Sequence, residues 1–155
     1  MRLGDRGVDK AGQPTAAFEP GADVHAKVTI FCDGVRGNLT KTLVRDFALD
    51  RGRLPQTYAL GLKELWEVPA GRLAAGAVIH TVGAPLGVRA FGGGFIYGAR
   101  DAVVSLGLVS GLDYRDPLFD PFEAFQRFKQ HPFVTRLLDG GQVLRSGAKA
   151  LPEGG

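Results

Sequence analysis

The sequence is poor in cysteine, and this excludes several kinds of site. Cys32 is the single cysteine among 155 residues, so the chain can form no internal disulfide framework and supplies no four-cysteine iron–sulfur site. The histidines, His25, His80 and His131, are far apart, and neither an HExxH nor a CxxC spacing occurs. We therefore predict no dedicated metal site.

Long apolar runs and concentrated charge are also missing. No run of about 18 apolar residues occurs, so no membrane-spanning helix is predicted. The N-terminal MRLGDRGVDKAGQ has no apolar core of the kind that a secretory signal needs, and it is too acidic and glycine-rich for a typical transit peptide. The net charge is +3 and the basic residues are scattered, which argues against nucleic acid as a partner but leaves a membrane surface open.

What remains is the composition of a folded domain. Apolar residues make up 45% of the chain and charged residues 23%, and the length suffices for one domain with a real core. Asp23–Phe31 is rich in β-branched and apolar residues and predicts a strand. After a turn at Asp33–Gly34, apolar residues recur at helical spacing over residues 39–47, with Asn38 or Thr40 available as the N-cap.

The second part of the chain predicts strands first and helices afterwards. The predicted strands are Gln56–Val68, Ala77–Gly83, Ala90–Tyr97, Ala102–Ser110 and a short last one in the tail VLRSGAKALPEGG. Strands that follow one another without helices between them imply an antiparallel sheet. Asp120–Pro121 opens a predicted helix, and Pro132 ends or restarts it before a second short helix at Phe133–Leu138. The predicted fold class is α+β.

The segment FGGGFIY, residues 91–97, is the first candidate site. Three consecutive glycines weaken a strand, so a close approach to the backbone is the usual reason for them. One interpretation is that a flat ring lies against bare backbone between apolar walls, which suits a quinone head group. The other, more frequent one is a β-bulge or a tight hairpin corner.

Asp33 and Gly34 form the second candidate site. An acidic residue and a glycine between a strand and a helix can contact the sugar or phosphate of a nucleotide cofactor. The commoner alternative is a plain turn in which Asp33 caps the helix. No GxGxxG motif is present, and Gly92–Gly94 does not replace it because no crossover helix follows.

The other polar and aromatic residues suggest structural roles. Lys63, Glu64 and Glu67 around Trp66 predict a half-exposed strand edge rather than an acid/base pair. His80, among apolar neighbours, is expected to be a core or interface histidine.

The aromatic and thiol side chains are assigned no chemistry. Phe122, Phe125 and Phe128 predict core packing. Nothing basic beside Cys32 suggests a reactive thiol, and no GxSxG motif supports a hydrolase. No catalytic residue is assigned.

Seven strings in a fixed order resemble the middle of the electron transfer flavoprotein–ubiquinone oxidoreductase family, and they cover nearly the whole chain. The strings are HAKVTIFCDGVRGNLTKTL, PQTYALGLKELWEVP, HTVGAPL, FGGGFIYG, VSLGLVSGLDYRDP, PFEAFQRFKQHP and SGAKALPEGG. The resemblance implies an enzyme with FAD and a 4Fe-4S cluster that passes electrons from reduced electron transfer flavoprotein to membrane ubiquinone.

The resemblance also implies a domain organisation. Residues 1–50 would belong to an FAD-binding domain, residues 51–138 to a ubiquinone-binding domain, and residues 139–155 would return to the FAD-binding domain. The glycine-rich FAD motif is expected before residue 1 and the cluster cysteines after residue 155. The chain would then be an interior segment that fully ligates neither cofactor and is no complete catalyst alone.

The family motif places the quinone at Gly92 and Gly93, and Asp33 and Gly34 match its acidic-glycine turn near the flavin. The chain departs from the family at four positions near the quinone, where the family has tyrosine, serine, histidine and tryptophan; here they are Phe91, Gly94, Gly98 and Ala84. A wider or altered quinone slot is expected. The residues suited to its mouth are Pro85, Leu86, Val88, Phe95 and Ile96.

The implied partners are ubiquinone, electron transfer flavoprotein, the rest of the parent enzyme and a membrane surface. The implied location is peripheral, at the cytoplasmic side of a bacterial inner membrane or the matrix side of the mitochondrial one. Two alternatives stay open: a quinone- or partner-binding module that transfers no electrons, and a relative of FAD-dependent hydroxylases or prenyl reductases.

Overall fold

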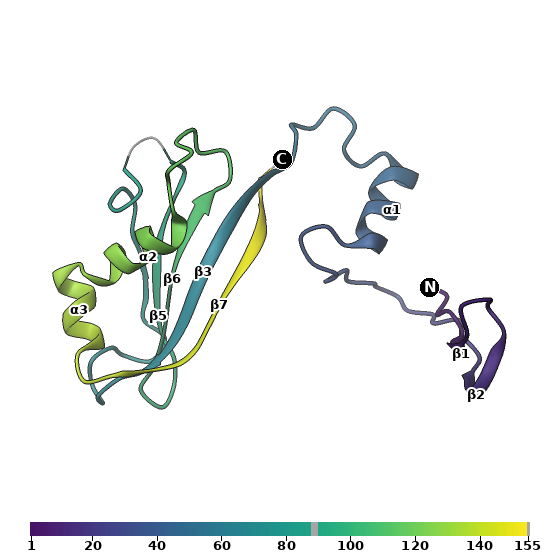
Figure 1. The fold of residues 1–155 in the computed structure, drawn as a ribbon, viewed down its shortest axis with the longest axis horizontal. Coiled ribbons are helices and arrows are strands. Elements are labelled where there is room, and N and C mark those ends of the chain that lie inside the picture. The colour runs from purple at the N-terminus through teal and green to yellow at the C-terminus, as the bar shows by residue number, and fades with distance from the viewer. Residues whose placement is uncertain (88–89, 155) are drawn as a thin grey trace. The chain divides into compact units, whose positions relative to one another are not determined.

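The computed structural model describes residues 1–87 and 90–154 (Figure 1). The chain divides into two compact units, Met1–Thr40 and Lys41–Gly155. No helix in the described ranges is long and apolar enough to cross a membrane. Val88, which we expected at the quinone mouth, lies outside the described residues.

The first unit contains a small antiparallel hairpin. Its strands are β1 (Arg6–Val8) and β2 (Pro14–Glu19), and the carboxylate of Asp9 closes the turn by accepting from the amides of Ala11 and Gln13 at 2.8 and 2.9 Å.

The strand predicted over Asp23–Phe31 is wrong. Within that segment only Asp23 pairs, in an isolated bridge to Arg2, and Val28 and Ile30 are 76% and 82% exposed. A β-strand requires a neighbour for its backbone hydrogen bonds. No other described segment pairs with this stretch, so its β-branched residues form no strand here.

The helix predicted after the glycine turn is α1, Asn38–Phe47. Asp33 supplies acceptors for its first turn: Oδ2 accepts from the amides of Leu39 and Thr40 at 3.0 and 3.1 Å, and Oδ1 from the Thr40 hydroxyl at 2.5 Å. Thr40 therefore donates to the capping carboxylate rather than capping the helix itself. The hydrogen bond from the Thr40 hydroxyl, followed by the one from its amide, holds the pKa of Asp33 below its ordinary value.

The second unit is built on a five-stranded antiparallel sheet with strand order β4-β5-β6-β3-β7. Its strands are β3 (Thr57–Glu67), β4 (Val78–His80), β5 (Gly92–Gly98), β6 (Val103–Gly111) and β7 (Gln142–Glu153). The predicted antiparallel sheet is confirmed, although β4 is shorter and β7 much longer than expected. β3 lies between β6 and β7, so the strand edge predicted around Trp66 is wrong.

Two helices cover one face of this sheet (Figure 1). They are α2 (Pro121–Lys129) and α3 (Pro132–Leu138), both close to prediction. Asp120 caps α2 by accepting from the amides of Phe122 and Glu123, as its position before a proline predicts. The α+β class is thereby confirmed for this unit.

The core lies between that sheet face and the helices. Alternate strand residues point to one face, and they meet apolar side chains of α2 and α3. The main contributors are Leu62, Ile96, Val104, Leu106, Leu108, Phe125, Phe128, Val134 and Leu137. Phe125 and Phe128 are core residues as predicted, but Phe122 is 59% exposed and belongs to the outer side of α2.

A buried ion pair ties α2 to the sheet. Lys129 Nζ lies 2.9 and 3.0 Å from the two carboxylate oxygens of Glu64, and the side chains are only 17% and 9% exposed. The indole N–H of Trp66 donates to the same carboxylate at 2.7 Å. Each buried charge therefore depends on the other for compensation.

We expect Lys129→Met to lower the free energy of unfolding by about 3 kcal/mol, because it leaves the Glu64 carboxylate buried and uncompensated. Urea denaturation followed by the fluorescence of Trp66, the single tryptophan, measures this. Lys149→Met, on the exposed part of β7, is the matched control. The double variant Glu64→Gln/Lys129→Met should regain most of the loss, and equal effects at Lys129 and Lys149 would contradict the interpretation.

We also expect acid to loosen the start of α1. Because the pKa of Asp33 is lower in the folded chain, its capping is fully present above the unfolded pKa of about 3.9 and is lost as the pH falls through the folded value. Amide hydrogen exchange at Leu39 and Thr40 reports this loss, and Asp33→Ala should reproduce it at neutral pH. Asp50→Ala, beyond the end of α1, should not.

Candidate functional site

Gly92 begins β5 at a place where the chain leaves no room for a side chain. Its φ is +136°, and an added Cβ would collide with the carbonyl oxygen of Val109 and lie 2.9 Å from Cδ1 of Leu86. β5 pairs with β6 without a register shift, so neither a bulge nor a hairpin corner explains this glycine. Gly92 is instead explained by the close approach of Val109 and Leu86, which occupy the space of a side chain.

The next two glycines are confined in the same way. A Cβ on Gly93 would collide with the carbonyl oxygen of Thr81, and one on Gly94 with the ring of Phe128. The amide of Gly94 donates to the Thr81 hydroxyl at 3.0 Å. The side of each glycine where a Cβ would stand is therefore filled by protein atoms.

A cavity of about 880 Å³ opens beside this glycine run. The described residues that line it are Leu86, Gly87, Ala90, Asp113, Tyr114, Arg115, Asp116 and Phe119. Gly92 and Gly93 are not among them, but Leu86, which meets Gly92 directly, is. A volume of this size lies within the range of about 300–1,000 Å³ usual for small-molecule sites.

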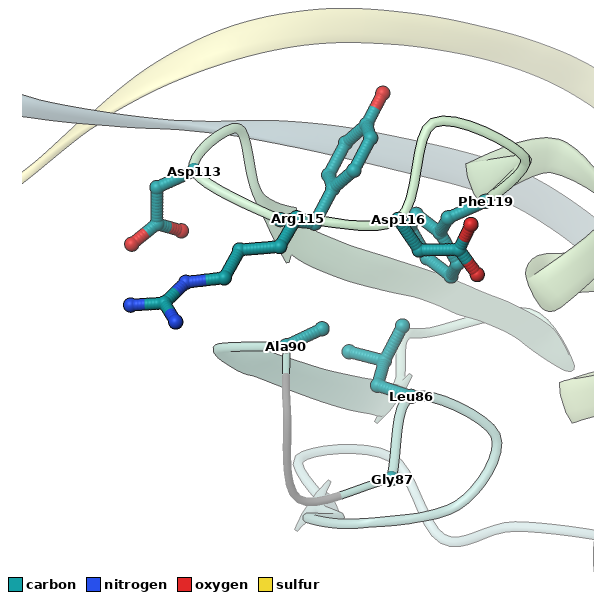
Figure 2. A pocket seen from close by; sticks show the side chains of 8 residues that line it. Leu86, Gly87, Ala90, Asp113, Arg115, Asp116 and Phe119 are labelled. Atoms are coloured by element: carbon teal, nitrogen blue, oxygen red, sulfur yellow. The ribbon is translucent and has the colours of Figure 1, made fainter.

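The two walls of the cavity differ in chemistry. Figure 2 shows Leu86 and Ala90 reaching in from one segment, while Asp113, Arg115 and Asp116 come from the segment opposite. We call the first the apolar wall (residues 86, 87 and 90) and the second the polar wall (residues 113–116 and 119). Such a pairing can pack a ring on one side and hydrogen-bond its substituents on the other.

In the polar wall Asp116 accepts a hydrogen bond, while Asp113 has no hydrogen bond or ion pair to any residue that the structure describes. Oδ1 of Asp116 accepts from the amide of Leu118 at 2.9 Å, and the ring of Tyr114 packs edge-on against Phe119 with centroids 4.9 Å apart. Oδ1 of Asp113 lies 2.7 Å from where a Cβ of Gly111 would stand. The glycine at position 111 thus leaves room for the Asp113 carboxylate.

The residues expected at the mouth are only partly brought together. Leu86 lines the cavity. Ile96 is fully buried in the core, and Phe95 stacks on Tyr97 with ring centroids 5.0 Å apart. Sequence reasoning missed the polar wall, although the string LDYRDP follows a predicted strand directly and is the densest group of charges near it.

The other sequence candidates are not among the residues that line this cavity. Gly34 has a φ of +85° and no atom within 4 Å of its missing Cβ, while both carboxylate oxygens of Asp33 accept hydrogen bonds from the start of α1. His80 is exposed, so a core position for it is wrong and an interface position stays a prediction; its Nε2 lies 3.4 Å from the Tyr97 hydroxyl. The described residues contain no group of three or more His, Cys, Asp or Glu placed to hold a metal ion.

Comparison with known proteins gives a consistent result. The family model described as ETF-QO, ubiquinone-binding matches residues 58–151. That stretch contains both walls of the cavity and the whole glycine run.

Curated relatives match almost the whole chain. The electron transfer flavoprotein-ubiquinone oxidoreductase of Homo sapiens is 48% identical over 97% of the chain and 25% of its own length. The Oryza sativa protein of the same name is 44% identical over 97% of the chain and 27% of its length, and the probable one of Saccharomyces cerevisiae 42% over 97% and 24%. The chain thus spans about a quarter of the length of these relatives, and it belongs to the ETF-QO ubiquinone-binding family.

Proposed function

We propose that the cavity binds the ring of ubiquinone, and that the chain is the quinone-reducing part of an oxidoreductase that takes electrons from reduced electron transfer flavoprotein. The observation that carries this proposal is the cavity of about 880 Å³ beside the glycine run, within the stretch that the ubiquinone-binding family model matches. The names of the relatives support the electron donor and acceptor.

The two walls suit the two parts of a quinone. Its ring is flat and apolar and packs against Leu86 and Ala90, while its carbonyl oxygens face hydrogen-bond donors such as Arg115. We keep Gly92 and Gly93 in the proposed site. Gly92 contributes because any side chain there would displace Leu86, and with it the apolar wall.

A lipid-borne substrate requires an opening toward the membrane. Among the described residues the two most exposed large apolar side chains are Leu118, 89% exposed, and Val82, 88% exposed. Each lies within a few residues of one wall of the cavity. We propose that the protein is peripheral, with these loops against the bacterial inner membrane on its cytoplasmic side or the mitochondrial inner membrane on its matrix side.

The implied cofactors fit the described residues unequally. We propose that residues 1–50 and 139–155 belong to the FAD-binding part and that Asp33 and Gly34 lie near the flavin, which when bound accepts and donates electrons. The open side of Gly34 favours this, whereas the amides of Leu39 and Thr40 at the start of α1 are already bound by the carboxylate of Asp33. A 4Fe-4S cluster is not fitted: Cys32 is the single cysteine, so any cluster must be held by other parts of the enzyme.

A second function has one observation in its favour. Both walls of the cavity are made by residues of this chain, so the chain has the means to bind a quinone without transferring electrons. A protein of this kind would bind ubiquinone analogues and would fail to reduce them when electron transfer flavoprotein is supplied.

We expect Ala90→Trp, assayed in the complete enzyme that contains these residues, to raise the KM for ubiquinone at least ~10-fold, because the indole takes the space beside the apolar wall where the quinone ring packs. Loss of the quinone's packing is worth about 1.4 kcal/mol for each factor of ten. The flavin content and the rate of enzyme reduction by electron transfer flavoprotein should stay unchanged.

Ala75→Trp is the matched control, since Ala75 is exposed in the turn that adjoins Gly98, at the opposite end of β5. The same kinetics in both variants would rule the cavity out as the quinone site. Gly92→Val is less informative, because its side chain would collide with Val109 and disturb the sheet itself.

A further inference from the structure

Reduction of a quinone to a quinol consumes protons as well as electrons. Two electrons and two protons in total convert the two carbonyl oxygens of the ring into hydroxyls. On the function proposed above, the electrons come from reduced electron transfer flavoprotein. The protons must reach the quinone oxygens inside the cavity. They are delivered either by a titratable side chain in the cavity wall or by water that enters the cavity.

Among residues 1–87 and 90–154, the titratable groups that line the cavity all belong to the polar wall. They are Asp113, Tyr114, Arg115 and Asp116, and the described residues of the apolar wall carry none. A guanidinium does not release its proton in proteins. Oδ1 of Asp116 accepts from the amide of Leu118 and the ring of Tyr114 packs against Phe119, so contacts within the polar wall fix both side chains.

Asp113 is the remaining candidate, and its position is unusual. It lies two residues beyond the end of β6, and its Oδ1 stands over Gly111, 2.7 Å from the missing Cβ. The same missing Cβ would lie 3.3 Å from Cβ of Phe91, and the Gly111 amide donates to the carbonyl oxygen of Phe91 at 2.8 Å. The Asp113 carboxylate is thus placed where the glycine run of β5 begins.

Asp113 also meets water. Its side chain is exposed, so bulk solvent can return a proton to it after each transfer. Figure 2 shows the side chains of Asp113 and Arg115 extending to the same side of the cavity, which places a positive charge near the anion that forms on the quinone.

We propose that Asp113 is the proton donor to the reduced quinone. The O–H bond of its carboxylic acid breaks, an O–H bond forms on the nearer quinone oxygen, and water from the surface protonates the carboxylate again; the oxygen on the far side of the ring takes its proton from water. Transient protonation suffices, because the oxygen of a reduced quinone is a much stronger base than a carboxylate. Arg115 stabilises the anionic intermediate until the proton arrives.

The test compares Asp113→Asn with Asp101→Asn in the complete enzyme. Asp101 is an exposed aspartate in the turn between β5 and β6 with a φ of +58°, a conformation that asparagine tolerates. Asp113→Asn should lower kcat for ubiquinone on the order of 100-fold, with KM and the rate of enzyme reduction by electron transfer flavoprotein unchanged. Asp101→Asn should match the parent.

Two further measurements distinguish proton delivery from a structural role. The solvent deuterium isotope effect on kcat should rise in Asp113→Asn, because proton transfer then limits turnover, and Asp113→Glu should restore most of the rate. Asp113→Ser, which removes the acid without keeping its shape, should lose as much as Asp113→Asn.

The outcomes separate this inference from the proposed function. An unchanged kcat and isotope effect in Asp113→Asn, together with a blocked Ala90→Trp enzyme, would overturn the role of Asp113 alone. If Ala90→Trp also left the reduction of ubiquinone unchanged, the cavity would not be the quinone site and both proposals would fall.

Discussion

The second unit depends on how closely β5 packs against its own neighbours. Gly92, Gly93 and Gly94 meet the carbonyl oxygens of Val109 and Thr81 and the ring of Phe128 where side chains would otherwise stand. This contact brings the loop after β4 and helix α2 onto the same strand. Leu86 belongs to that loop and lines the cavity, and α2 directly follows the polar wall. The lack of side chains at the three glycines therefore fixes the positions of both walls.

The ion pair between Glu64 and Lys129 acts on the same arrangement from the other end of α2. It joins the interior strand β3 to the last residue of the helix, while Asp120 fixes the first turn. A helix held at both ends keeps Phe128 over Gly94 and keeps Phe119 at the cavity. The buried charges therefore bear on the site through geometry, without touching a ligand.

Local signals predicted most elements of this unit, because their information lies within a few residues. The strands β3, β5 and β6 have apolar patterns of their own, and Asp120 before Pro121 is a cap signal. The strand expected over Asp23–Phe31 failed because a strand also needs a partner. The prediction that β3 is an edge strand failed for a related reason. Its second partner, β7, lies about 85 residues further along the chain, with pairs from Thr57↔Glu153 to Glu67↔Gln142. This pairing makes β3 an interior strand and buries Glu64.

The triple glycine Gly92–Gly94 is unusual in the sequence itself, and it drew attention to this part of the chain. The reason why side chains are absent there was only partly predicted. We expected a ligand to lie against the bare backbone of these glycines. In the structure, atoms of Val109, Thr81 and Phe128 lie there instead, and the cavity is beside them, next to Leu86. The polar wall could not be found in this way, since Asp113, Arg115 and Asp116 are ordinary exposed charges in sequence. They share a cavity with Leu86 only because the loop after β6 lies opposite the loop after β4. The proton delivery that we propose therefore depends on both loops and is not encoded in either sequence motif.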